Sequence, residues 1–253
     1  MASDQNETGK TAIITGAGSG VGRASAIALA NRGWNVGLIG RTRSSLEATA
    51  EMIGGKTAIA TGDVASPDDV SRMFAEIVAL FGHLDLLFNN AGRGAPGTPI
   101  DEMSLDDWYG VVNANLNGSM LCARAAFAQM RSQSPQGGRI INNGSISAHA
   151  PRPGSTAYTT TKHAITGLTK CLSLDGRPFN IACGQIDIGN ALTEMAMPMT
   201  KGVPQADGSI KVEATMDPDH IADSVAHMAE FPLETNVQFM TVMATKMPFV
   251  GRG

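Results

Sequence analysis

The chain has 253 residues, of which 43% are hydrophobic and 17% are charged, and its formal net charge at pH 7 is −4. This composition is typical of a folded globular protein, and the acidic balance argues against a nucleic-acid-binding surface. No apolar run approaches the ~18 residues needed to span a bilayer, so no membrane association is expected. The polar N-terminus does not resemble a signal peptide. The three cysteines are widely spaced, which predicts buried free thiols in the cytoplasm and no metal site.

Apolar runs alternate with amphipathic stretches from one end of the chain to the other. The amphipathic stretches predict helices, three of which have capping residues before them: Asp68–Phe81, Trp108–Arg131 and Asp219–Phe231. The predicted strands are 11–15, 35–40, 56–60, 84–89, 139–143, 179–183 and 237–243. This alternation predicts an α/β Rossmann fold: one domain over residues 1–253, with a doubly wound parallel sheet of about seven strands and helices on both faces. Residues 1–8 are expected to be flexible.

A glycine-rich stretch, Thr15-Gly-Ala-Gly-Ser-Gly-Val-Gly22, follows the first predicted strand and opens onto a helix-like segment. Glycines let a backbone approach a phosphate closely, and a helix N-terminus offers free N–H groups to an anion. The strict G-x-G-x-x-G spacing is absent, because the spacing is Gly16-x-x-x-Gly20-x-Gly22. An ordinary glycine turn is the alternative. The candidate cofactor-binding residues here are Gly16, Ser19, Gly20, Val21 and Gly22.

The end of the second strand bears on the choice between NAD and NADP. A dinucleotide fold usually presents an acidic residue to the adenosine ribose at this point, and here Gly40 is followed by Arg41 and Arg43. An arginine can pair with the 2′-phosphate of NADP. Arg41 therefore favours NADP, with NAD as the alternative. If the two arginines only form a solvated helix start, they give no preference.

Three further strand ends carry small or polar residues. Asp63 and Val64 follow the third strand, where the carboxylate could accept a hydrogen bond from an adenine amino group. The stretch Asn89-Asn-Ala-Gly92 ends the fourth strand and leaves room for a ribose. Ser145 ends the fifth and could hold a substrate oxygen. In an open parallel sheet these ends face the ligand crevice.

Tyr158 and Lys162 are four residues apart in a helix-like stretch, so both side chains lie on one face. A phenol is a poor base at neutral pH, and an adjacent ammonium group favours the phenolate form. Taken alone, a Tyr/Lys pair of this kind is usually ordinary surface. The pair indicates a catalytic site only together with the other motifs of the chain.

The combined motifs resemble the short-chain dehydrogenase/reductase family, over roughly residues 8 to 183. The motifs that carry the resemblance are Thr15-Gly-x-x-x-Gly-x-Gly22, Asp63-Val64, Asn89-Asn-Ala-Gly92, Asn115-Leu-Asn-Gly118, Ser145 and Tyr158-x-x-x-Lys162. The resemblance implies that Tyr158 is the general acid/base, that Ser145 positions the substrate oxygen and that Lys162 assists the phenol and binds the nicotinamide ribose. It also implies that Asn115 anchors a water in a proton relay. The implied cofactor contacts are Gly16, Gly20, Val21 and Gly22 at the diphosphate, Asp63 and Val64 at the adenine, and Asn90, Ala91 and Gly92 beside the ribose.

The C-terminal third departs from the family pattern. Where the family usually shows Pro-Gly and then a threonine, this chain has Cys183-Gly-Gln-Ile-Asp-Ile-Gly-Asn190, with Thr193 downstream of its usual place. Ile186 is expected to offer backbone groups to the carboxamide. Residues 191–215 are rich in methionine and are expected to form a lid over the substrate, the alternative being an excursion without a substrate role.

These features together predict an NAD(P)-dependent oxidoreductase that transfers a hydride between nicotinamide and a carbonyl or secondary alcohol substrate. NADP is preferred over NAD. The resemblance implies a homodimer or homotetramer. The alternative function is a catalytically silent NAD(P)-binding sensor or interaction module.

Overall fold

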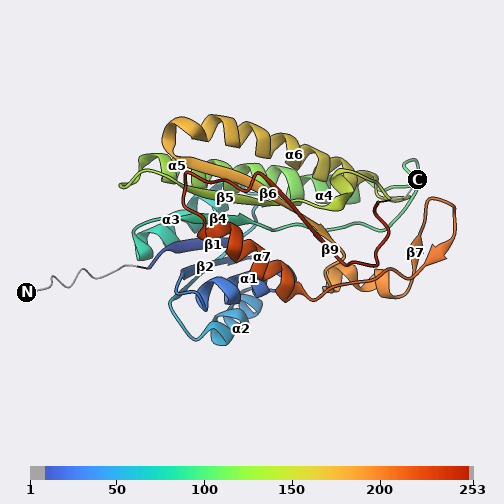
Figure 1. Cartoon of the computed structure of the whole chain (residues 1–253), viewed down its shortest axis with the longest axis horizontal. Helices are drawn as coiled ribbons and strands as arrows, with labels where there is room; N and C mark the ends of the chain where they lie inside the picture. The colour runs from blue at the N-terminus through green and yellow to red at the C-terminus, as the bar shows by residue number, and fades with distance from the viewer. Residues whose placement is uncertain (1–8, 251–253) are drawn as a thin grey trace, which may run out of the picture.

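The computed structural model describes residues 9–250, so the expected flexibility of residues 1–8 lies outside the described part of the chain. Seven strands form one sheet in the order β3-β2-β1-β4-β5-β6-β9, and each neighbouring pair is parallel (Figure 1). This order confirms the predicted doubly wound Rossmann fold. The strands are β1 (Thr11–Thr15), β2 (Asn35–Gly40), β3 (Thr57–Thr61), β4 (Leu86–Asn89), β5 (Gly138–Asn143), β6 (Ile181–Gly189) and β9 (Phe239–Met243).

Helices cover both faces of the sheet, which is why its strands are apolar on both sides (Figure 1). Ile13 and Ile14 are adjacent in β1 and belong to opposite core clusters, as the alternation of side chains along a strand requires. Within the described residues, no helix combines the length and apolar character needed to cross a membrane. One face carries α1 (Gly20–Ala30), α2 (Arg43–Ile53) and α7 (Pro218–Glu230), and the other carries α3 (Pro67–Phe81), α5 (Gly118–Ser132) and α6 (Thr156–Gly176).

The single helix predicted over Trp108–Arg131 is interrupted. It begins as α4 (Leu105–Val112) after Ser104, whose hydroxyl accepts a hydrogen bond from the Asp107 N–H at 3.0 Å. A π-helical turn, η1 (Asn113–Asn117), then joins α4 to α5. Such turns widen a helix by one residue and occur frequently at functional sites. Here the turn contains the buried Asn115.

Strand β6 is longer than the predicted strand over Phe179–Cys183. It continues to Gly189, and from Gln185 onward it pairs with β9. The segment that departs from the family pattern is therefore part of the sheet. Because it contains no proline, every residue has an N–H that can join the ladder of hydrogen bonds.

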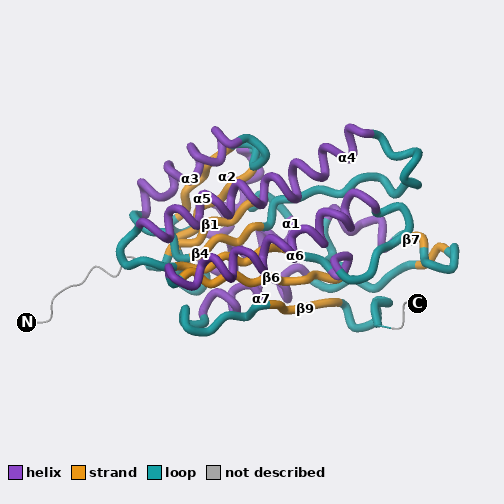
Figure 2. Tube along the Cα trace, turned by 90° about the horizontal axis from the view of Figure 1, so that it is seen from above, coloured by secondary structure: helices purple, strands orange, loops and turns teal. Residues whose placement is uncertain are grey.

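The segment 191–216 carries structure that the sequence did not predict. It contains the short 3₁₀ helix η4 (Glu194–Thr200) and a small hairpin of β7 (Val203–Pro204) and β8 (Ile210–Lys211). Its two ends meet, since Leu192 and Met216 are joined by a backbone hydrogen bond of 2.7 Å. The hairpin projects from one end of the molecule (Figure 2).

Arg139 ties the start of β5 to the connection between α7 and β9. Its buried guanidinium donates to the carbonyls of Phe231, Pro232 and Thr235 and to the side chain of Asn236, at 2.9 to 3.2 Å. Burial lowers the pKa of this guanidinium. The four acceptors hold the connection against the amino end of the sheet, opposite the edge where the candidate site lies.

The prediction that all three cysteines are buried is wrong for Cys171, which is exposed. Cys122 and Cys183 are buried, and burial raises the pKa of each thiol to about 12. At mildly alkaline pH we expect a chromogenic disulfide reagent to label Cys171 alone, because the other two thiols stay protonated and shielded. All three should react after unfolding in denaturant. Native labelling that persists in Cys171→Ser would contradict this expectation.

Candidate active site

The glycine-rich loop between β1 and α1 forms a concave backbone surface. Gly16 and Gly20 have φ of +68° and +51°, a conformation that favours glycine. A Cβ on Gly22 would lie 2.2 Å from the Gly16 carbonyl oxygen, so no side chain fits there. Ser19 precedes α1 without a side-chain cap, and the first turn holds no acidic residue. Helix N–H groups and an open cradle fit an anionic group such as a diphosphate.

A continuous chain of hydrogen bonds connects this loop to α6. The Thr15 hydroxyl accepts from the backbone N–H groups of Asn90 and Ala91, both at 2.9 Å, and the Thr15 carbonyl accepts from the Asn90 side chain at 2.9 Å. Asn90 Oδ1 in turn accepts from Asn143 Nδ2 at 2.7 Å. The Asn143 carbonyl accepts from Lys162 Nζ at 2.7 Å. The ends of β1, β4 and β5 are thereby locked together with the Lys162 side chain.

Tyr158 and Lys162 lie on one face of α6, as their spacing predicted. Lys162 Nζ is 5.5 Å from the centre of the Tyr158 ring, and the Lys162 side chain is buried. Burial of an ammonium group is costly unless it is hydrogen-bonded, which the Asn143 carbonyl provides. The cation is therefore fixed beside the phenol.

Asn115 in the π turn is connected to α6 by its side chain. Its Nδ2 donates to Thr161 Oγ1 at 3.3 Å and to the Arg93 carbonyl at 3.0 Å, while its Oδ1 accepts from the Arg93 N–H at 2.8 Å. Thr161 Oγ1 donates to the Tyr158 carbonyl at 2.8 Å. The loop after β4 is close as well, because a Cβ on Gly92 would lie 3.0 Å from Asn115 Oδ1.

Ser145 follows β5 and begins a 3₁₀ turn, η2 (Ile146–Ala148). Its Oγ accepts from the Ser147 N–H at 3.1 Å, and its own backbone N–H donates to Asp187 Oδ1 at 3.0 Å. Both Ser145 and Asp187 are buried. The serine is thus held from both its side chain and its backbone.

Asp187 is a residue that sequence reasoning missed. Its carboxylate also accepts from Gln185 Nε2 at 2.7 Å, and its second oxygen is 2.9 Å from His149 Nε2. The available signal was an acidic residue in a strand whose only other polar side chain is Gln185. Buried carboxylates need such partners, and those of Asp187 include the backbone of Ser145.

The predicted adenosine-side residues lie at neighbouring strand ends. Arg41 follows β2 and Asp63 follows β3, and both are exposed. Asp63 Oδ1 accepts from the Ala65 N–H at 2.9 Å, which shapes the turn, while Val64 is buried against Gly118 at the start of α5. Val21 of the glycine loop packs against the core cluster beneath it.

Ile186, whose backbone was expected to face the carboxamide, lies within the sheet. This residue is fully buried inside β6, its carbonyl accepts from the Gly144 N–H at 2.8 Å, and it pairs with Met240 on the other side. Its backbone groups are therefore used by the sheet. Thr193, which is downstream of the family's usual threonine in the sequence, lies against the glycine-rich loop, because a Cβ on Gly20 would be 3.1 Å from Thr193 Cγ2.

Residues 10–204 match the family model described as short chain dehydrogenase. The chain belongs to the short-chain dehydrogenase family. It is 38% identical to a 3beta-hydroxysteroid dehydrogenase of Mediterraneibacter gnavus over 180 residues, which cover 70% of this chain and 64% of that relative, slightly less than two thirds. It is 31% identical to the short chain dehydrogenase/reductase astE of Aspergillus oryzae over 230 residues, covering 87% and 88% of the two chains.

A solved structure extends the same comparison. The crystal structure of 3-ketoacyl-(acyl-carrier-protein) reductase from Brucella melitensis, complexed with NADH, matches with a TM-score of 0.83 at 26% identity. The match covers 92% of this chain and 96% of that one. The protein is thus an oxidoreductase of the short-chain dehydrogenase family.

In this short-chain dehydrogenase we expect Asp187→Ala to lower the free energy of unfolding by about 2–3 kcal/mol, because it leaves the buried Ser145 N–H and the Gln185 amide without their acceptor. Asp187→Asn keeps an acceptor oxygen and should cost about 1 kcal/mol. Denaturant unfolding measures both variants. An alanine variant as stable as the asparagine variant would show that these hydrogen bonds contribute little.

Proposed function

We propose that this chain is a cytoplasmic, NADP-preferring oxidoreductase that transfers a hydride between nicotinamide and a carbonyl or secondary alcohol carbon. The observation that carries the proposal is the hydrogen-bond chain from Thr15 to Lys162, which joins an anion-accepting loop to a Tyr/Lys pair. A binding loop and a proton-transfer pair held in one rigid network suit a dehydrogenase.

The cofactor fits the residues that are present. Gly16 and Gly20 are left-handed and Gly22 excludes a side chain, which together leave backbone room for a diphosphate. When bound, the nicotinamide ring supplies or accepts the hydride. The residues that would hold the cofactor are Gly16, Ser19, Gly20, Val21 and Gly22 at the diphosphate, Asp63 and Val64 at the adenine, and Asn90, Ala91, Gly92, Tyr158 and Lys162 at the nicotinamide side.

Tyr158 is the proton donor and acceptor in this proposal. In the reductive direction its hydroxyl gives a proton to the developing alkoxide. Ser145 donates a hydrogen bond to the same oxygen: because its Oγ is held by the Ser147 N–H, it keeps its own proton for the substrate. Lys162 donates one of its three N–H groups to the Asn143 carbonyl, so two N–H groups remain for the phenol and the ribose.

Asn115 would complete the proton relay through a water. The π turn presents it toward α6, where it contacts Thr161. The segment 191–215 would form the substrate lid, since Thr193 lies against the glycine loop. The whole chain would act as one domain, in a homodimer or homotetramer.

Replacing Tyr158 by Phe removes the hydroxyl with its transferable proton and keeps the rest of the side chain. We expect turnover to fall by roughly 10²–10⁴-fold, while the dissociation constant for NADPH stays within about twofold. NADPH consumption with a panel of carbonyls (2,3-butanedione, a 3-ketosteroid and an acetoacetyl thioester) measures turnover, and fluorescence titration measures binding. A wild-type protein that binds NADPH and reduces nothing would instead be the silent binding module.

Arg41 is the proposed reader of the 2′-phosphate. We expect the wild type to bind NADPH at least tenfold more tightly than NADH, about 1.4 kcal/mol, and Arg41→Asp to reverse the preference. Arg43→Ala is the matched control, because Arg43 is already paired with Glu47 at 2.9 Å. Tighter binding of NADH by the wild type would refute the NADP assignment and favour NAD-linked alcohol oxidation.

A further inference from the structure

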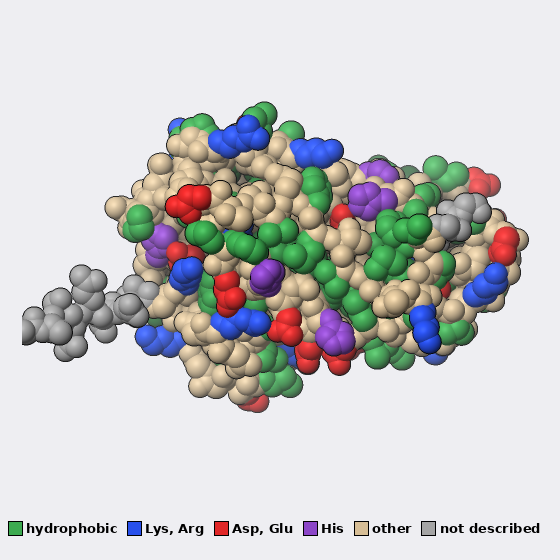
Figure 3. Space-filling model, viewed as in Figure 1, with side chains coloured by type: hydrophobic (Ala, Val, Ile, Leu, Met, Phe, Trp, Pro, Cys, Tyr) green, Lys and Arg blue, Asp and Glu red, His purple; other side chains and the backbone are tan. Residues whose placement is uncertain are grey.

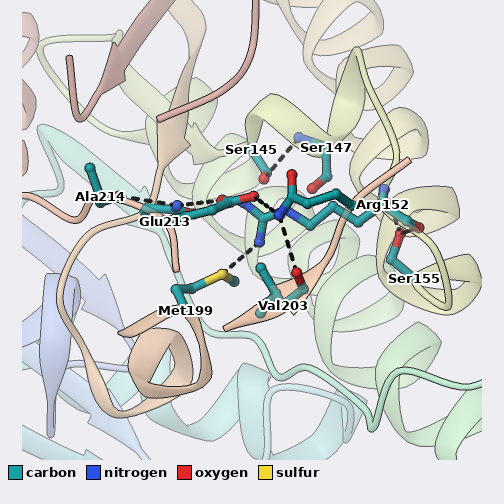
Figure 4. Close-up of polar contacts among 10 residues, drawn as sticks. Ser145, Ser147, Arg152, Ser155, Met199, Val203, Glu213 and Ala214 are labelled. Carbon is teal, nitrogen blue, oxygen red and sulfur yellow. Dashed lines mark hydrogen bonds and ion pairs between the residues drawn. The ribbon is translucent and has the colours of Figure 1, made fainter. Parts of the chain in front are cut away.

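An ion pair between Arg152 and Glu213 joins two segments that are far apart in the sequence. Arg152 lies in the loop between Ser145 and Tyr158, and Glu213 lies in the segment 191–216. The side chains are 15% and 1% exposed, so both charges are largely removed from water. Figure 4 shows the two side chains pointing toward each other, with Met199 beside Arg152. An exposed pair contributes little, whereas a buried one strongly penalises the loss of either partner.

Polar groups from three places complete the network around this pair. Asn190, directly after β6, accepts from Arg152 at 3.0 Å through Oδ1 and donates to Glu213 at 2.8 Å through Nδ2. Gln205 donates to the second Glu213 oxygen at 3.0 Å. The Glu213 N–H donates to the Met199 carbonyl at 3.1 Å. Asn190, just before the segment 191–216, and Gln205, within it, are therefore both tied to this ion pair.

Arg152 is itself fixed to the beginning of α6. Its N–H donates to Ser155 Oγ at 3.2 Å, and Ser155 Oγ is 2.7 Å from the Arg152 carbonyl. The same hydroxyl is 2.8 Å from Thr159 Oγ1, on the residue next to Tyr158. The network thus reaches the helix that carries the proposed proton donor.

The segment 191–216 also meets the residue that follows Ser145. Ala214 and Met216 pack in a cluster with the buried Ile146. Apolar side chains of the segment remain exposed, among them Met195 and Met197 at 50% and 46%. Figure 3 shows apolar side chains at this end of the molecule, where β7 lies in Figure 1. An apolar segment beside Ser145 suits contact with a substrate.

We propose that the Arg152–Glu213 pair is the latch that fixes the segment 191–216 in one position over the substrate, and that both are positioning residues that set substrate affinity. This inference rests on the proposed function for its substrate. Moving the segment away would leave a buried carboxylate without its cation, which is costly, so the ion pair favours the position seen here. Neither residue takes part in proton transfer.

Three variants and one matched control test the latch. Glu213→Gln keeps the shape and removes the charge, Arg152→Met removes the cation, and the third variant combines the two. Asp207→Asn is the control, because Asp207 pairs with Lys211 in the same segment with both side chains more than 60% exposed. Trypsin cleavage after the exposed Lys201 reports opening of the segment without any substrate.

We expect each single variant to be cleaved about tenfold faster than the wild type and to raise KM for the carbonyl reduced best by about tenfold, with kcat changed less than about threefold. The double variant should be no worse than the worse single, because both act through one contact. Asp207→Asn should match the wild type.

Unchanged cleavage in Glu213→Gln would overturn the latch, and so would a double variant whose effect is the product of the two singles. Faster cleavage with an unchanged KM would overturn the positioning role. If Arg152→Met does not fold, Glu213→Gln decides alone. A wild type that reduces no carbonyl would refute the proposed function, while the trypsin comparison would still support or overturn the latch.

Discussion

Thr15 and Asn90 make the contact on which the rest of the site depends. Thr15 ends β1, and its hydroxyl and its carbonyl both accept hydrogen bonds from Asn90. Asn90 accepts in turn from Asn143, whose carbonyl accepts from Lys162. Each of these groups would be costly to bury alone. Because the strands are parallel and in register, their carboxyl ends coincide, and short polar side chains can satisfy one another across the edge.

Two buried carboxylates extend this arrangement around the stretch from Ser145 to Tyr158. Asp187 holds the Ser145 backbone from β6, and Glu213 holds the loop at Arg152 from the segment 191–216. A connection between a strand and a helix is usually among the more variable parts of a fold. Here charged groups from outside the connection hold it, at Ser145 and at Arg152. Rigid support of this kind is what precise positioning of reacting groups requires.

The elements with local signals could be predicted from the sequence, and those that depend on distant contacts could not. Residues close together in the sequence give the signals for strand β1, for the helix cap at Ser104 and for the Tyr158–Lys162 pair. The role of Asp187 depends on Ser145, more than forty positions away in the chain, and no periodicity encodes it. The end of β6 was misjudged, because the strand was expected to end at Cys183, whereas pairing with β9 extends it to Gly189.

The π turn at Asn113–Asn117 has an evolutionary consequence. Deleting one residue from this turn would convert it into a regular α-helix, which has more favourable hydrogen bonding than a π turn. The deletion would also turn Asn115 away from Thr161 by about 100°, the angle per residue of an α-helix. At this turn the more stable helix and the observed position of Asn115 are therefore incompatible. Selection for thermal stability alone would allow the extra residue to be lost.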